Sequence, residues 1–381
     1  MGLFADRTRL ELILQCTLNI SIAVAPEERC TTRMPQNRTV TVFGAYGHTG
    51  RFVVAELRRR GATPILAGRD AARLRAIGAE YPELEVHVAD VEQPHLLDAA
   101  LSGSAAVINC AGPFSDTAIP VVEAALRARV HYLDLAAEQQ AVLTIFERFE
   151  ARARGAGVTA VPAMAFYGGL ADLMATAAMA DWNDADEIAI AVALDTWRPT
   201  RGTRLTGARN QGRRFVFSRN RLQKADLPSG RRWAFPKPIG ELDVVPLPLA
   251  ETITISRHLR TPEIMMFLNE APLADLHNPD TPPPTPADPS GRSSQRFVMD
   301  VIVRRKDAQR RLVACGRDIY ASTAPIVVEA TERVISGLAR KTGVVAPGDA
   351  FDARDFLNAL SPAHLEIAPG DQTVDVTGRR P

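Results

Sequence analysis

Three glycines close a short apolar run and have the spacing that a phosphate-binding turn requires. Gly44, Gly47 and Gly50 end the stretch VTVFGAYGHTG with the pattern G-x-x-G-x-x-G. In such a turn from a strand into a helix, the first glycine permits the sharp bend and the second admits a pyrophosphate to the backbone. The third lets the helix pack closely on the strand. The free N–H groups and positive dipole end of the helix predicted at 49–60 would bind that phosphate. The predicted phosphate-binding residues are Gly44, Tyr46, Gly47, His48, Thr49 and Gly50.

The end of the next predicted strand, residues 63–68, indicates which dinucleotide the turn would hold. NAD-binding folds commonly place an acid here that binds the ribose hydroxyls, whereas an arginine accommodates the 2′-phosphate of NADP. Arg69 occupies this position and can form a forked, charge-assisted pair with a phosphate. Asp70 is the competing ribose ligand, but it is also placed to cap a helix predicted at 71–80. The sequence therefore favours NADP(H) over NAD(H).

Strands continue to alternate with helices as far as residue 162, with strands predicted at 84–90, 105–110, 131–135 and 158–162. This order predicts an α/β fold, a Rossmann doubly wound parallel sheet with right-handed crossovers. It also favours a dinucleotide site over a glycine turn that binds nothing. Ligands of such sheets lie at the carboxyl ends of the strands. We therefore expect the adenine to contact Asp90 and Val91, and the nicotinamide half to border Ala111, Gly112 and Pro113.

Polar side chains near these strand ends could donate the proton that reduction of a carbonyl, imine or enoyl acceptor needs. Tyr132 and Asp134 share one face of the strand at 131–135, with His131 on the other face, and Tyr167 follows the next strand. A core position for Tyr132 and a helix cap for Asp134 are the structural alternatives, and both interpretations stay open. The catalytic candidates are Tyr132, Asp134 and Tyr167.

The rest of the chain predicts a second, mixed α/β domain for substrate binding and dimerisation. Apolar and polar residues alternate, as in half-exposed antiparallel strands, over 187–195, 214–218, 252–256, 295–304 and 311–316. Proline-rich residues 272–292 predict a long surface loop, either an active-site lid or an incidental excursion. Helices are predicted at 323–341 and 352–360. The predicted division is a disordered N-terminal extension (1–34), a Rossmann domain (35–165), the substrate domain (166–320) and C-terminal helices that return to the Rossmann domain (321–368).

Composition restricts the classes of partner. A formal net charge of +1, with 23% charged residues, gives no overall attraction to nucleic acid or membranes. The apolar stretch at 10–25 is interrupted by polar residues and too short for a membrane span. Four cysteines without a C-x-x-C pair and seven histidines without H-E-x-x-H predict neither a metal site nor a disulfide framework, which suits a cytoplasmic location.

Charge is concentrated in one place, where eight arginines lie between Arg198 and Arg221 without an acid. Arginine forks bind carboxylates and phosphates, so this stretch predicts an anionic or carrier-bound substrate. A solvated face or dimer rim is the alternative. Nucleic acid is disfavoured because few aromatic residues accompany the arginines.

Four segments together resemble the saccharopine dehydrogenase-like oxidoreductases, which include saccharopine reductases and trans-acting enoyl reductases. They are VFGAYGHTGR, VINCAGPF, VVEAALRARVHYLDLAAE and VTAVPAMAFYGGLADLMA. The resemblance implies an NADP-binding Rossmann domain, a second domain that carries the substrate and often the dimer contact, and reduction of a C=N or activated C=C bond. The chain departs from the enoyl reductases where they tend to have an S-G-G-T-like turn, since residues 200–203 read Thr-Arg-Gly-Thr. Substrate identity therefore does not carry over. A regulatory module that senses NADPH without turnover is the alternative function.

Overall fold

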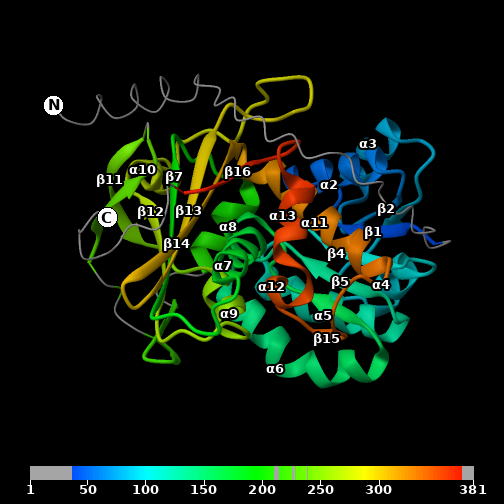
Figure 1. Ribbon diagram of the computed structural model, residues 1–381. Helices are drawn as coiled ribbons and strands as arrows, with labels where there is room; N and C mark the ends of the chain where they lie inside the picture. Colours follow the sequence, from blue (N-terminus) through cyan, green and yellow to red (C-terminus); the bar gives the residue numbers. More distant parts are fainter. Residues whose placement is uncertain (1–36, 210–213, 225–226, 228, 238, 371–381) are drawn as a thin grey trace, which may run out of the picture.

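The computed structural model describes residues 37–209, 214–224, 227, 229–237 and 239–370. The prediction for the N-terminal extension falls outside the described residues. Within them, two sheets and the helices that surround them account for most of the chain (Figure 1).

The first sheet has seven strands in the order β15-β6-β5-β4-β1-β2-β3, and every neighbouring pair is parallel. This confirms the predicted doubly wound sheet. Its central strands are buried on both faces because helices cover both, as parallel sheets require. The strands are β1 Thr39–Phe43, β2 Thr63–Gly68, β3 Val86–Val88, β4 Ala106–Asn109, β5 His131–Asp134, β6 Thr159–Val161 and β15 Gly343–Val344.

Helices pack on the two faces of this sheet as separate groups. One face is covered by α4, α5 and α6 and the other by α2, which packs against the C-terminal helix α11. Pairing of β15 with β6 also brings the C-terminal part of the chain back to this sheet. The helices are α2 His48–Arg59, α3 Ala71–Glu80, α4 Pro94–Leu101, α5 Phe114–Ala128, α6 Gln139–Ala156 and α11 Ile319–Ile335.

The second sheet has nine strands, of which seven follow the order β10-β11-β12-β7-β13-β14-β16, while β8 pairs with β12 and β9. All its pairs are antiparallel except β7 with β12, so the second domain is mixed as predicted. The strands are β7 Glu187–Leu194, β8 Phe215–Ser218, β9 Arg221–Lys224, β10 Arg231–Phe235, β11 Gly240–Pro246, β12 Ile264–Asn269, β13 Arg296–Arg305, β14 Ala308–Arg317 and β16 Glu366–Pro369.

This second sheet curls strongly upon itself. Trp233 of β10 donates its indole N–H to Asp300 of β13 (2.8 Å), although three strands lie between β10 and β13 in the sheet. The guanidinium of Arg311 on β14 likewise donates to the backbone carbonyl of Ala234 on β10 (2.7 Å). The inward side chains of β7, Ala189 and its neighbours at 191 and 193, are small and fully buried, which leaves room for the aromatic rings of the facing strands.

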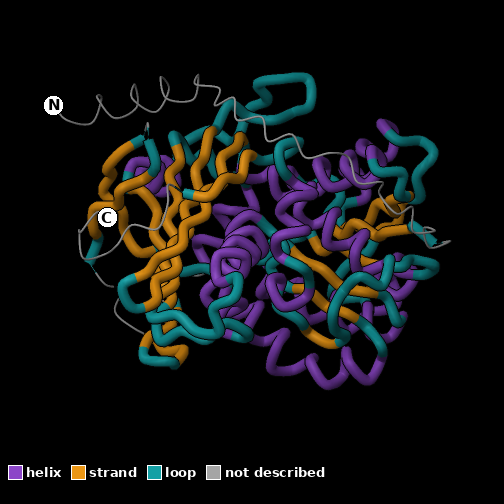
Figure 2. The backbone as a smooth tube through the Cα atoms, viewed as in Figure 1, coloured by secondary structure: helices purple, strands orange, loops and turns teal. Residues whose placement is uncertain are grey.

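Helices fill the space between the two sheets, as Figure 2 shows. A π-helical turn, η1 (Phe166–Leu170), leads from β6 into α7 (Ala171–Met179), which packs on β13 and β14. The remaining helices are α8 Arg201–Arg209, α9 Ala250–Ser256, α10 Ala271–His277, α12 Pro347–Ala350 and α13 Ala353–Leu360. No helix in the described parts of the chain is long and apolar enough to cross a membrane.

Three expectations about local structure were wrong. Residues 252–256 were predicted as a strand but belong to helix α9. Every residue from Ala250 to Ile255 is buried, so this helix lacks the amphipathic pattern by which a surface helix is recognised. The proline-rich region 272–292 is not loop throughout, because α10 accommodates Pro272 in its first turn, where the missing N–H costs nothing. Helix α11 begins before the predicted Thr323 because Asp318 caps it.

Candidate functional site

The glycine-rich turn has the geometry that its spacing predicts. Gly44 has a φ of +88°, in the left-handed region that favours glycine. A Cβ on Gly50 would lie 2.3 Å from the carbonyl oxygen of Gly44, so only glycine permits this approach of helix to strand. Gly47 is the N-cap of α2, and none of the described side chains caps this helix or places an acid in its first turn. The N–H groups of the α2 N-terminus are therefore available to an anion.

Tyr46 and His48 belong to this turn and contact different neighbours. The ring of Tyr46 covers Gly68 at the end of β2, where a Cβ would lie 2.6 Å from the ring. His48 is edge-on to the rings of Phe52 (5.3 Å) and Tyr320 (5.4 Å). Its Nε2 is buried and has no hydrogen-bond partner among the described residues, and burial lowers the pKa of the imidazole. A neutral ring, with a nitrogen that no described residue contacts by a hydrogen bond, is thus held within the glycine-rich turn.

The end of β2 places Arg69 and Asp70 differently. The carboxylate of Asp70 accepts from the backbone N–H groups of Ala72 and Arg73 (3.0 Å each), which confirms it as the cap of α3. Arg69 is exposed beside it. Arg73, which sequence reasoning missed, stacks its guanidinium over the ring of Tyr46 at 4.6 Å. A second cation therefore lies at the same strand end as Arg69.

The loop after β4 is fixed by its own polar side chains. Asn109 accepts from the N–H of Ala111 (3.0 Å) and donates to Thr117 (3.2 Å), whose hydroxyl donates to the carbonyl of Ala111 (2.6 Å). The peptide bond between Gly112 and Pro113 is cis. Ala111, Gly112 and Pro113 are thereby held at the carboxyl edge of the sheet, beside the turn after β1. Asp90 and Val91 lie further along this edge, at the end of β3, both half-buried.

Glu138 joins this loop to helix α8 of the second domain. One carboxylate oxygen accepts from the backbone N–H of Phe114 (2.9 Å) and from the hydroxyl of Thr206 on α8 (3.0 Å). The other accepts from the N–H of Ala137 (3.1 Å). Burial raises the pKa of this carboxyl, against the effect of these donors. Since a Cβ on Gly112 would lie 3.6 Å from the hydroxyl of Thr206, α8 directly covers the loop.

Tyr132 and Asp134 form a fully buried pair. The phenol of Tyr132 donates to Asp134 (2.7 Å), whose other oxygen accepts from the N–H groups of Ala136 (2.9 Å) and Ala163 (2.7 Å). Burial raises the pKa of Asp134 to about 6. His131 lies on the opposite face and accepts from the N–H of Thr159 (3.1 Å). These contacts fix the loops after β5 and β6, which supports the structural alternative, and the catalytic role of this pair stays a prediction.

Tyr167 has a different environment from that pair. Its ring stacks on Trp197 with 5.8 Å between centroids, and its hydroxyl is buried without a hydrogen-bond partner in the described part of the chain. Burial raises the pKa of this phenol, and the acidic groups of Tyr320 and Glu251 nearby raise it further. The phenol therefore remains protonated at neutral pH and has a proton that no described group accepts.

Glu251, which sequence reasoning missed, lies close to Tyr167 in the first turn of α9. One oxygen accepts from the backbone N–H of Leu249 (2.7 Å), and the other has no well-aligned hydrogen bond to any described residue. Burial raises the pKa of this carboxyl to about 7, although the buried guanidinium of Arg214 opposes the shift. No signal in the sequence marks Glu251, because its neighbours read as an alternating strand.

Comparison with known proteins was decisive for the first domain. Residues 40–161 match the family model described as the saccharopine dehydrogenase NADP binding domain. The first domain of the chain is therefore similar to the NADP-binding domain of saccharopine dehydrogenases. The predicted NADP preference is thereby confirmed at the level of the domain.

Curated proteins that are similar to this domain come from distant organisms. A trans-acting enoyl reductase of Mycobacterium tuberculosis is 27% identical over 133 residues, which cover 33% of this chain and 32% of the relative. A human saccharopine dehydrogenase-like oxidoreductase is 27% identical over 152 residues, 35% of each chain. The chain thus aligns with about a third of the length of these curated relatives.

The fold extends beyond this shared domain. Apo saccharopine dehydrogenase (L-Glu forming) from Saccharomyces cerevisiae matches 88% of this chain and 99% of its own length with a TM-score of 0.61, at 13% identity. This likeness shows that the second domain has the saccharopine dehydrogenase fold as well. In the described residues, no group of three or more His, Cys, Asp or Glu side chains is arranged to hold a metal ion.

Proposed function

We propose that the protein is an NADP(H)-dependent oxidoreductase that reduces a C=N or activated C=C bond of a small or carrier-bound anionic substrate. The observation that carries this proposal is the contact between the two domains at the carboxyl edge of the first sheet. Helix α8 of the second domain covers the loop of Ala111, Gly112 and Pro113 through the bond between Thr206 and Glu138. A cofactor bound at the glycine-rich turn would therefore have its nicotinamide half enclosed, and exclusion of water favours hydride transfer.

NADPH supplies a hydride when it is bound, and the protein must supply orientation and a proton. The residues of the turn after β1, from Gly44 to Gly50, would bind the pyrophosphate, and Arg69 with Arg73 the 2′-phosphate. Asp90 and Val91 would contact the adenine.

We assign the proton to the phenol of Tyr167. As the hydride adds to carbon, the C=N or C=C bond opens, and its electron pair takes the proton from the Tyr167 oxygen. Glu251 can then return a proton to the phenolate, because a carboxyl with a pKa of about 7 is partly protonated at neutral pH. The support for this assignment is that each side chain has a polar atom without a hydrogen-bond partner in the part of the chain that the structure describes.

The test is a screen of imine, enoyl and keto acceptors that follows NADPH absorbance. We expect turnover with one of these classes, and a loss of kcat of about 100-fold or more in Tyr167→Phe, since general acid catalysis contributes about 10²–10⁴. Tight NADPH binding without turnover of any class would instead support the NADPH-sensing module. The cytoplasmic location, which rests on cysteine usage, and the homodimer, which rests on the resemblance, both remain predictions. Sedimentation of the purified protein would check the dimer.

A further inference from the structure

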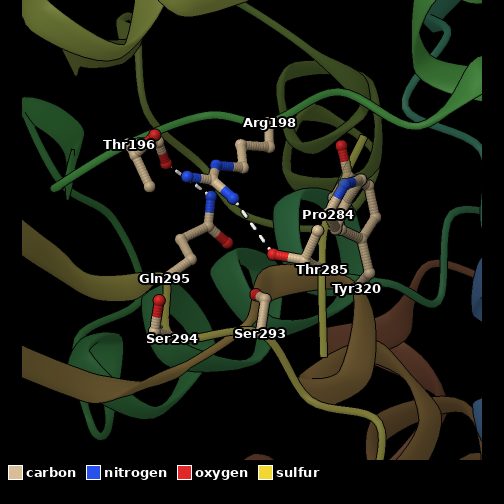
Figure 3. A pocket seen from close by; sticks show the side chains of 8 residues that line it. All are labelled: Thr196, Arg198, Pro284, Thr285, Ser293, Ser294, Gln295 and Tyr320. Atoms are coloured by element: carbon tan, nitrogen blue, oxygen red, sulfur yellow. Dashed lines mark hydrogen bonds between the residues drawn. The ribbon is translucent and has the colours of Figure 1, made fainter. Parts of the chain in front are cut away.

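An open pocket lies between the segment that leaves β7, the proline-rich loop and the segment that enters β13. Figure 3 shows the side chains that line it, Thr196, Arg198, Pro284, Thr285, Ser293, Ser294, Gln295 and Tyr320. Hydroxyl, amide and guanidinium groups make up its polar wall, and none of these lining side chains is a carboxylate. A pocket with this composition offers hydrogen-bond donors to an anion.

Arg198 is the one charged side chain of this wall. In Figure 3 its guanidinium extends into the pocket toward Thr285, and Nη1 donates to the Thr285 hydroxyl at 3.0 Å. Among the described residues no carboxylate pairs with Arg198, whereas Arg209 of the same arginine-rich stretch pairs with Asp116. A guanidinium has five N–H donors, so a single bond to a hydroxyl leaves most of them free.

The surroundings add positive charge. Arg204 donates to the backbone carbonyls of Asn278 (3.1 Å) and Thr281 (2.8 Å), which fixes the proline-rich loop without neutralising the guanidinium. Two acids are bonded to residues of this wall. Asp318 accepts from the backbone N–H groups of Ser293 (2.7 Å) and Tyr320 (3.0 Å), and Asp275 accepts from the hydroxyl of Thr196 (2.7 Å) and the backbone N–H of Trp197 (3.2 Å). Neither carboxylate lines the pocket, so the charge that faces an anion there is the guanidinium of Arg198.

Individual side chains link the wall of this pocket to the proposed reaction site. The ring of Tyr320 forms part of its wall and is edge-on to His48 of the glycine-rich turn, 5.4 Å away. The phenol oxygen of Tyr320 accepts from the indole N–H of Trp197 (3.0 Å), and Trp197 stacks on Tyr167. A substrate whose reacting bond lies at Tyr167 could therefore extend its far end toward Arg198.

We infer that this pocket is a subsite for an oxyanion of the substrate, a carboxylate or a phosphate, which Arg198 and Thr285 bind together. The inference rests on the proposed function, because it takes the ligand of the pocket to be the substrate. Either a small carboxylic acid or the phosphopantetheine arm of a carrier protein could supply the oxyanion. Arg198 thereby acquires a role that distinguishes it from the other arginines of its stretch.

The experiment titrates the NADP⁺-saturated full-length protein with glutarate and, separately, with 4′-phosphopantetheine, followed by calorimetry. Saturation with NADP⁺ blocks the cofactor's own phosphate sites. We expect binding of at least one probe, weakened about tenfold or more in Arg198→Ala, the range for a lost charge-assisted bond. Thr285→Val, which keeps the shape of the side chain, should weaken it less. Tighter binding of glutarate would assign a small acid, and tighter binding of phosphopantetheine a carrier arm.

Arg201→Ala is the matched control, since Arg201 is an exposed arginine of the same stretch that does not line the pocket. It should leave the affinity for both probes unchanged, and all variants should keep the melting temperature and the NADP⁺ affinity of the wild type. Equal losses in Arg198→Ala and Arg201→Ala, or no binding of either probe, would overturn the subsite. A wild type that does not bind NADP⁺ would overturn the proposed function, which is a separate result.

Discussion

The proposed nucleotide half of the site is formed by backbone, whereas the proposed substrate half is formed by side chains from distant segments. Between Gly44 and Gly50, the glycines present N–H groups at the end of a strand, and the geometry follows from local spacing. In the proposed substrate half, η1, α8 and α9 bring together Tyr167, Thr206 and Glu251. Tyr167 and Glu251 each have a polar atom without a hydrogen-bond partner among the described residues. A site formed by backbone tolerates little change in residue size, while a site formed by side chains can change its chemistry without changing the fold.

The largest expected effect lies in the nucleotide half. Gly47→Val should reduce NADPH affinity by at least about 100-fold, because its branches would occupy the space of the pyrophosphate. The protein should still fold, since φ at this position is −68° and a Cβ would meet its nearest atom, the Gly44 oxygen, at 3.1 Å. Fluorescence titration with NADPH measures the loss. Gly155→Ala is the control, because a Cβ there meets no described atom within 4 Å. Retained affinity in Gly47→Val would show that this turn does not hold phosphate.

The next prediction concerns the buried acid of the substrate half. Burial raises the pKa of Glu251 from 4.5 to about 7, so the folded protein holds this proton more tightly than the unfolded chain. The resulting stabilisation is complete below pH 4.5 and is lost as the pH rises through 7. The Glu251→Gln variant places a side chain there that never ionises. Between pH 4.5 and 8, its free energy of unfolding should therefore fall less than that of the wild type, and the difference should reach up to about 3 kcal/mol.

Urea denaturation at several pH values measures this difference. Glu241→Gln, at an exposed position on β11, is the control and should keep the pH dependence of the wild type. Identical pH profiles for the wild type and Glu251→Gln would mean that Glu251 ionises normally, and its place as proton source would be lost.

A smaller effect should separate the two cations at the end of β2. Arg69→Ala and Arg73→Ala should each weaken NADPH binding by about 1.5–3 kcal/mol, the range for hydrogen bonds to charged groups, and leave NADH unaffected. Arg69→Asp should reverse the cofactor preference, because a carboxylate repels the 2′-phosphate and accepts from ribose hydroxyls. Titration with both cofactors decides the matter, with exposed Arg75→Ala as the control. Equal losses for NADPH and NADH would contradict the assignment of the phosphate to these arginines.

The smallest effect should come from Asp70. Its carboxylate caps α3, so Asp70→Ala should lower the free energy of unfolding by about 1 kcal/mol. The ratio of NADPH to NADH affinity should not change, because the cap does not contact the ribose phosphate. Thermal denaturation and cofactor titration together test this, with Asp70→Ser as a variant that keeps a cap. A change of tenfold or more in the cofactor ratio would make Asp70 a ribose ligand after all.

The same contrast explains what the sequence could predict. The spacing of Gly44, Gly47 and Gly50, the strands up to β6 and the cap at Asp70 depend on local geometry, so all were predictable. The environments of Tyr167 and Glu251 depend on contacts with Trp197 and α9, which lie far away in the chain. The sequence predicted a strand directly after Glu251, where the structure has helix α9. Because this helix is buried on all sides, its sequence shows no amphipathic pattern. Arg73 could have been found, since it lies one helical turn beyond Arg69.

One feature of the fold bears on how the protein is synthesised. The C-terminal segment contributes an edge strand to each sheet, β15 to the first and β16 to the second. The first sheet can acquire its full set of strands only after residue 344 has left the ribosome, and the second only after residue 369. The first sheet, although its first strand is made early, therefore closes its edge beside β6 only once β15 has been made, and until then β6 is an unpaired edge strand of the kind that is prone to association.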